Sequence, residues 1–219
     1  MRTAPFADRR AAGRALAARL AGTLPGDAVV LGLPRGGAVV AAEVAAVLDL
    51  PLDVLLVRKL GLPGQPELAM GAVAAVGDTV ETVRTDRVLA AAAVDDATFA
   101  GVRDRELAEL HRRAAAYRGS RAPVAVAGRT VVLVDDGLAT GATVRAALQA
   151  LAQQRPARTV VAVPVASSGA LHEVGALADE VVSLLVPPSF RAVGAAYRDF
   201  AQTSDDEVRD LLRSAAPEL

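Results

Sequence analysis

The chain has 219 residues, a formal net charge of −1 and no cysteine. The near-neutral charge argues against a general nucleic-acid binder, and the lack of cysteine excludes disulfides, thiol catalysis and cysteine metal sites. The length suits a single domain, 1–219, whose core consists of Ala, Val and Leu, because 53% of the residues are hydrophobic and only 3% aromatic. The sequence shows neither a signal peptide nor an apolar run of membrane-spanning length, so we expect a cytoplasmic protein with no membrane partner.

The first half of the chain alternates between helical and strand patterns. Apolar periodicity predicts a helix at 6–21, a buried strand at 28–33, a helix at 37–48 and a second strand at 52–57. Two further runs, 70–76 and 79–83, are separated by Gly77 and Asp78 and are typical of a hairpin. Asp95 is expected to cap a long helix that ends near Arg118, at Gly119.

The second half continues this alternation. We expect a strand at 131–134 with a helix to about Gln153, a strand at 159–165, a helix through Ala178 and a strand at 180–186. Ser204 and Glu207 form a capping box that begins a terminal helix. Strands that alternate with helices predict an α/β fold, with a doubly wound, mainly parallel sheet flanked by helices.

The most informative segment is 131–143. Its four apolar residues, 131–134, suit a strand that is covered on both faces, and Asp135 and Asp136 follow where that strand ends. Open α/β sheets bind ligands at this edge. The small and hydroxyl residues of 137–143 then open a helix and offer backbone N–H groups that suit a phosphate. The pattern indicates a ligand with both a phosphate and hydroxyls or Mg²⁺; the alternative is an ordinary turn whose Asp and Thr cap the helix.

Two other strand ends carry cations. Arg35, Gly36 and Gly37 lie between the first strand and its helix, where the glycines allow a close backbone approach and the arginine can meet a polyanion. Arg58 and Lys59, the only lysine, follow the second strand. Lysine is a compact donor to phosphate oxygens, so a specific role is indicated. The alternatives are a glycine-rich turn with a solvent-facing arginine, and a salt-bridged strand end.

The segment 131–143 resembles the PRPP-binding signature of type I phosphoribosyltransferases. Together with the segments 33–37, 57–61 and 187–190 and the capped last helix, it makes nearly the whole chain similar to a bacterial group of phosphoribosyltransferase-like proteins. The resemblance implies the type I phosphoribosyltransferase fold, with a helical insertion at about 77–123 and a small C-terminal hood at about 186–203. It further implies PRPP and a base-like small molecule as partners, Mg²⁺ as cofactor, and a fold on which homodimers are common.

The resemblance also assigns roles to residues. Asp135 and Asp136 would hold the ribose hydroxyls, meeting Mg²⁺ through water or the ribose rather than as confident direct ligands. Phe190 in the hood would stack on the acceptor, or else simply pack under the sheet. The 5′-phosphate would be bound by Gly137, Ala139, Thr140, Gly141, Ala142 and Thr143. The pyrophosphate would be bound by Arg35, Gly36, Gly37, Arg58 and Lys59. The catalytic groups would be Asp135, Asp136, Arg58 and Lys59.

A loop at 61–67, rich in glycine and proline, or the insertion at 77–123 is expected to cover the reacting centre and exclude water. Three functions remain open at this point. The first is transfer of 5-phosphoribosyl from PRPP, the second is a PRPP- or nucleotide-sensing regulator without catalysis, and the third is hydrolysis of a phosphorylated sugar at the same site.

Overall fold

The computed structural model describes residues 5–76, 79–119 and 121–215. Its main sheet has five strands in the order β2-β1-β6-β7-β8, and every neighbouring pair is parallel. These strands are β1 (Val29–Gly32), β2 (Leu52–Val54), β6 (Thr130–Val134), β7 (Arg158–Val165) and β8 (Glu180–Leu185). The predicted α/β fold with a parallel sheet is confirmed.

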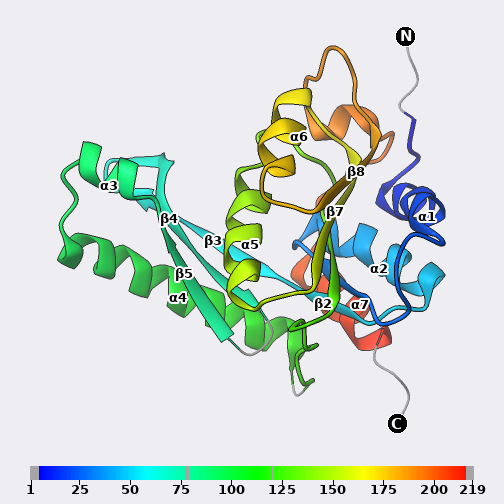
Figure 1. Ribbon diagram of the computed structural model, residues 1–219, viewed down its shortest axis with the longest axis horizontal. Coiled ribbons are helices and arrows are strands. Elements are labelled where there is room, and N and C mark those ends of the chain that lie inside the picture. The colour runs from blue at the N-terminus through cyan, green and yellow to red at the C-terminus, as the bar shows by residue number, and fades with distance from the viewer. Residues whose placement is uncertain (1–4, 77–78, 120, 216–219) are drawn as a thin grey trace.

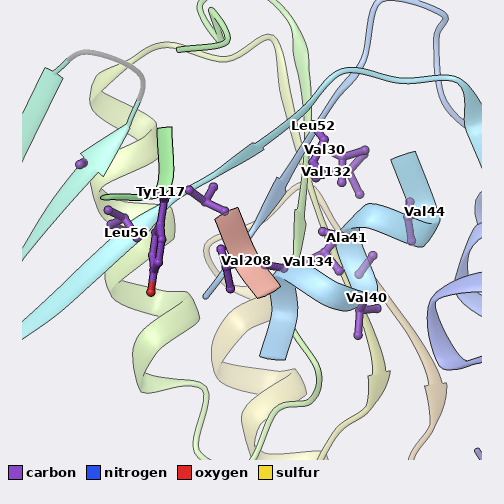
Figure 2. Close-up of a cluster of buried hydrophobic side chains, with 14 of the residues drawn as sticks. Val30, Val40, Ala41, Val44, Leu52, Leu56, Tyr117, Val132, Val134 and Val208 are labelled. Atoms are coloured by element: carbon purple, nitrogen blue, oxygen red, sulfur yellow. The ribbon is translucent and has the colours of Figure 1, made fainter. Parts of the chain in front are cut away.

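Helices cover both faces of this sheet (Figure 1). The helices on one side are α1 (Arg9–Leu20), α2 (Gly36–Leu48) and α7 (Asp205–Ser214), and those on the other are α5 (Ala142–Gln153) and α6 (Ser168–Gly175). Successive side chains of a strand point to opposite faces, so uninterrupted apolar strands supply two cores at once. Val30 and Val132 face the α2 side, as Figure 2 shows, whereas Val29 and Val131 face the α5 side.

A second, antiparallel sheet projects from the first as an arm (Figure 1). It consists of β3 (Leu56–Leu62), β4 (Gln65–Val76) and β5 (Thr79–Arg84), and is followed by α3 (Asp86–Ala91) and α4 (Asp96–Arg118). Leu60 and Met70 pack with Phe99 of α4 on one face, and Ala74 packs with Leu148 of α5 on the other. The helix α4 that was expected in an insertion at 77–123 therefore covers a sheet that already begins at Leu56.

The sequence prediction differs from the structure in two places within this arm. The single strand predicted at 52–57 was wrong, because β2 ends at Val54 and β3 begins at Leu56 in the other sheet. The segment 61–67, predicted to be a loop, instead forms the paired ends of β3 and β4 with a tight turn between them, and its role in covering the reacting centre stays a prediction. Gly64, at φ +81°, supplies the positive φ that so tight a turn requires.

Helix capping was read correctly from the sequence. The Asp95 carboxylate accepts a hydrogen bond from Thr98 N, and α4 ends at Arg118 with Gly119 as its C-cap, at a φ of +57°. The Ser204 hydroxyl accepts from Glu207 N at the start of α7. These local signals suffice because caps satisfy backbone groups within a single turn. The hairpin at 70–76 and 79–83 is confirmed as β4 and β5, and its expected turn residues, Gly77 and Asp78, lie outside the described residues.

A buried ion pair fixes the end of α4 against the main sheet. Asp53 of β2 is only 2% exposed, and its Oδ1 accepts from Arg118 Nε at 3.1 Å. Arg118 Nη2 donates to Val54 O at 2.9 Å, and Asp53 Oδ2 accepts from Val124 N at 3.1 Å. The C-terminal end of α4 is thereby fixed to β2 of the main sheet. Within the described ranges, no helix is both long and apolar enough to cross a bilayer.

Candidate active site

The loops after β1 and β6 meet at the carboxyl edge of the main sheet. The two strands are parallel neighbours, and Leu33 N donates to Val134 O at 2.9 Å just before the loops begin. Asp135 and Asp136 follow immediately, and Asp135 Oδ1 accepts a hydrogen bond from Asp136 N at 2.8 Å. Since this edge is where parallel sheets bind ligands, the two carboxylates lie where the sequence placed them.

Gly36 and Gly37 lie directly against this acidic pair. A Cβ added to Gly36 would come within 1.9 Å of Asp136 Oδ2, and one added to Gly37 would lie 2.8 Å from Asp135 Cα. Real Cβ atoms do not approach other atoms so closely, so both positions need glycine for space rather than for a positive φ. The loop predicted to bind pyrophosphate and the acids predicted to bind ribose are therefore in direct contact. The peptide bond between Pro34 and Arg35 is cis.

Arg9 of α1 is a member of the site that the sequence analysis missed. Its Nε donates to Asp136 Oδ2 at 2.7 Å, and the two side chains are only 12% and 16% exposed. Its Nη1 donates to Ala201 O at 2.7 Å, and its guanidinium lies 3.8 Å from the centroid of the Phe200 ring. One arginine therefore joins the first helix, the acidic pair and the segment 186–203 that we expected to form a hood.

Tyr197 makes a second link between that segment and the acids. Its hydroxyl donates to Asp136 O at 2.6 Å, and its ring stacks on Phe200 with centroids 4.9 Å apart. Gly137 contributes by its small size, because a Cβ there would lie 2.6 Å from Val193 Cγ1. Neither Arg9 nor Tyr197 has a local sequence signal, because each meets Asp136 across more than sixty residues of chain.

The electrostatics of the acidic pair follow from burial and from Arg9. Burial raises the pKa of Asp135, and the neighbouring Asp136 carboxylate raises it further. Burial also raises the pKa of Asp136, while the hydrogen bond and the charge of Arg9 act to lower it. Two adjacent carboxylates in a low-dielectric site resist ionising together. The neutral, protonated form of Asp135 is therefore favoured more than in a solvent-exposed aspartate.

The loop between β6 and α5 has the form of an anion-binding turn. Gly141 adopts a left-handed conformation, with φ +71°, and immediately precedes α5. The first backbone bond at this end is from Arg145 N to Gly141 O, as expected for a helix whose initial N–H groups point outward. Ala139, Thr140 and Thr143 are exposed, and the Thr140 hydroxyl accepts weakly from Ala142 N at 3.4 Å. Of the residues predicted to bind the 5′-phosphate, Ala139, Thr140 and Thr143 are thus exposed around the N-terminus of α5, whereas Gly141 is buried.

A cavity lies between this turn and the loop after β1. It is small, with about 30 Å³ open to a water-sized molecule, and its wall includes Pro34, Arg58 and Thr143. Two segments predicted to bind pyrophosphate and one predicted to bind the 5′-phosphate thus border the same space. Arg58 is also paired with Glu106 of α4, at 2.7 Å from Nε, which confirms that this strand end is salt-bridged.

Lys59 and Phe190 are placed differently from the other candidates. Lys59 is exposed and alternates with Arg58 along β3, so it points to the opposite face of the arm. Phe190 is partly buried and packs with Val165 and Tyr197. Neither residue borders the cavity beside Pro34. Arg35 lies 4.0 Å from Asp205 of α7, measured from Nη1 to Oδ1. The ligand roles of all three residues stay predictions.

Residues 8–197 match the family model described as the phosphoribosyl transferase domain. The chain belongs to the phosphoribosyl transferase family. This membership agrees with the acids, the helix N-terminus and the glycine loop that meet at the sheet edge, and it supports a function of phosphoribosyltransferase type.

Several relatives of this phosphoribosyl transferase domain extend the comparison. Two Mycobacterium tuberculosis proteins, MT0597 and Rv0571c, provisionally named phosphoribosyl transferases, are each 49% identical over 210 residues. The match covers 96% of this chain but 47% of theirs, so the chain spans about half the length of these relatives. The crystal structure of TT1426 from Thermus thermophilus is 48% identical, with a TM-score of 0.85, and the match covers 96% of this chain and 99% of that one.

Proposed function

We propose that this domain transfers the 5-phosphoribosyl group of PRPP to a base-like small molecule and releases pyrophosphate, with Mg²⁺ as cofactor. The observation that carries the proposal is the packing of Gly36 and Gly37 directly against Asp136 and Asp135. This packing joins a loop suited to a polyanion and a pair of acids suited to a diol at one edge of the sheet. The α5 N-terminus follows the acids within a few residues.

Each part of PRPP has a suitable partner in this arrangement. The 5′-phosphate would lie on the N–H groups and hydroxyls of Thr140 to Thr143, where the helix dipole also favours an anion. The ribose hydroxyls would donate to the carboxylate of Asp135 and, beside the bond from Arg9, to that of Asp136. The pyrophosphate would then extend over Gly36 toward Arg58, which borders the same cavity as Thr143.

Transfer breaks the bond from C1 of the ribose to pyrophosphate, which leaves with the electron pair, while the acceptor supplies the electrons of the new bond to C1. Positive charge develops on the ribose and negative charge on the leaving group. Arg58 and the backbone N–H groups of the glycine loop would stabilise the leaving charge, and the acids would stabilise the ribose. Because these groups are fixed by the fold, they need little reorganisation during the reaction.

The residues of the site fit a magnesium ion that is held mainly by its ligand. Carboxylate oxygens are the donors that Mg²⁺ prefers, and the ion usually retains several waters and binds few protein groups. Asp135 would be the donor of choice, because Asp136 already accepts from Arg9. Within the described parts of the chain, no group of three or more His, Cys, Asp or Glu is arranged to hold a metal on its own. When bound, the ion would neutralise charge on the pyrophosphate.

Replacing Asp135→Asn is expected to weaken binding of PRPP, measured by titration calorimetry with Mg²⁺, by about ten- to one hundredfold. A hydrogen bond to a charged group is worth about 1.5–3 kcal/mol, and each 1.4 kcal/mol is about tenfold. The fold should persist because an amide oxygen can still accept from Asp136 N. Asp104→Asn, on the exposed face of α4, is the control and should bind as the original protein does.

Product analysis separates the proposed transfer from its alternatives. Pyrophosphate that is released only when an acceptor is present supports transfer, whereas release with water alone indicates a hydrolase. Saturable binding without turnover across a panel of bases would indicate a sensor. If millimolar PRPP with Mg²⁺ gave no binding heat and no protection against thermal unfolding, the proposed function would be wrong.

A further inference from the structure

Helix α4 of the arm borders the same cavity as the loops of the candidate site. The wall formed by the described residues includes two charged side chains, Arg58 from β3 and Arg113 from α4. Arg113 and Glu109, four residues earlier on α4, have the spacing of an ordinary i, i+4 ion pair. That pair exists, with Arg113 Nε donating to Glu109 Oε1 at 2.7 Å, but the side chain also reaches the cavity and is only 35% exposed.

The two arginines are oriented by carboxylates of α4. Glu106 accepts from Nε of Arg58 at 2.7 Å and contacts its Nη2 at 2.5 Å, while Glu109 accepts from Nε of Arg113. A guanidinium carries five N–H donors, so it can bind a carboxylate along one edge and a phosphate along another. The glutamates therefore orient the two guanidinium groups and leave N–H donors on each that can bind an anion.

The rest of the wall strengthens the attraction for an anion. Leu55, Leu56 and Leu110 line the cavity beside the arginines, and apolar walls increase the energy of a charge interaction compared with water. Pro34 on one side belongs to the glycine loop, and Thr143 on the other belongs to the first turn of α5. An anion at the mouth of this cavity would thus lie between the two loops that the proposed function already assigns to phosphates.

The charge of Arg35, from the glycine loop, acts on Tyr117 of α4, as the charge of Arg113 does. The phenol of Tyr117 on α4 donates to Asp205 Oδ1 at 2.6 Å. Burial raises the pKa of this phenol to about 12, and the charges of both Arg113 and Arg35 act in the opposite direction. The Tyr117 phenol therefore lies within reach of charges from the arm and from the glycine loop, and each of the two arginines also has a carboxylate partner.

We propose that Arg113 completes the pyrophosphate subsite, so that the inserted helix α4 supplies a substrate-binding cation together with Arg58. The inference rests on the proposed function and deepens it. It gives the arm a role in ligand binding, because α4 would carry a cation into the subsite as well as covering β3 and β4. It also assigns the subsite to arginine side chains. The paired N–H donors of a guanidinium match two phosphate oxygens of a diphosphate better than the ammonium group of a lysine does.

Arg112 offers a matched control for Arg113. It is the adjacent residue on α4, it donates to the same Glu109 through Nε at 2.7 Å, and its side chain is 62% exposed. It does not belong to the cavity wall. Arg112→Gln and Arg113→Gln therefore remove the same charge and bonds to the same carboxylate, and they differ in access to the cavity.

The test is calorimetric titration of the two variants and the original protein with Mg·pyrophosphate and, separately, with ribose 5-phosphate. Arg113→Gln should weaken pyrophosphate binding at least about tenfold and change ribose 5-phosphate binding less than about twofold. Arg112→Gln should change neither. The pyrophosphate affinity of Arg113→Lys should fall between that of Arg113→Gln and that of the original protein, because lysine keeps the charge but lacks the paired N–H donors of arginine.

Equal pyrophosphate affinity in the Arg113→Gln variant and the original protein would overturn the inference while leaving the proposed function in place. Loss of both ligands in that variant, with circular dichroism and thermal unfolding unchanged, would also overturn it, since the effect would not be confined to pyrophosphate. If pyrophosphate binds and depends on Arg113 but PRPP and ribose 5-phosphate do not bind, the anion site stands and the proposed function fails. An original protein that binds no pyrophosphate contradicts both.

Discussion

Gly36→Ala is expected to lower the affinity for ribose 5-phosphate and PRPP by about one hundredfold or more. The new Cβ would lie 1.9 Å from Asp136 Oδ2 and 2.7 Å from Arg9 Nε, so the carboxylate must move and its bond to Arg9 must break. Misplacing a positioning group by about 1 Å can cost about a hundredfold. Overpacking of this kind also costs about 1–3 kcal/mol of stability. Calorimetry and thermal unfolding measure the two effects.

Gly26→Ala is the matched control, because a Cβ at Gly26 meets nothing within 4 Å. Helix propensity alone makes the opposite prediction for Gly36, which is the first residue of α2, since alanine favours a helix by about 1 kcal/mol over glycine. A Gly36→Ala variant that is more stable and binds ribose 5-phosphate normally would therefore show that the close contact with Asp136 is unimportant.

Asp53→Ala is expected to destabilise the protein by about 3–5 kcal/mol, the usual cost of leaving one partner of a buried ion pair uncompensated. The Asp53 side chain is 3% exposed and that of Arg118 is 10% exposed. The substitution also removes the acceptor of the hydrogen bonds from Val54 N and Val124 N. Urea unfolding, with the free energy extrapolated to water, measures the loss.

Asp104→Ala serves as the comparison for Asp53→Ala. Asp104 pairs with Arg103 on α4, but its side chain is 62% exposed, and exposed pairs contribute less than about 1 kcal/mol. Similar free energies of unfolding for the two variants would mean that Asp53 and Arg118 do not hold β2 to the end of α4. A large loss in Asp53→Ala alone would confirm that the arm is anchored by this pair.

Much of the main sheet could be predicted because its strands are short, apolar and β-branched and its helices are capped locally. The β6 strand, the two acids after it and the turn into α5 form a continuous segment, so their chemistry is visible in one motif. The arm was harder to predict. Residues 52–57 are apolar except for Asp53, and only the pairing partners reveal that β2 and β3 join different sheets.

The sequence by itself determined the α/β fold and placed Asp135, Asp136 and the Thr140 turn at the ligand-binding edge, because backbone pattern and helix capping act within a few residues. Tertiary structure alone decided which cations join them. Arg9 reaches Asp136 from the first helix, and Arg113 reaches the cavity beside Pro34 from the arm. A charged residue on a helix surface has the same local pattern whether it faces solvent or a ligand site. Its function depends on which distant segment packs against it.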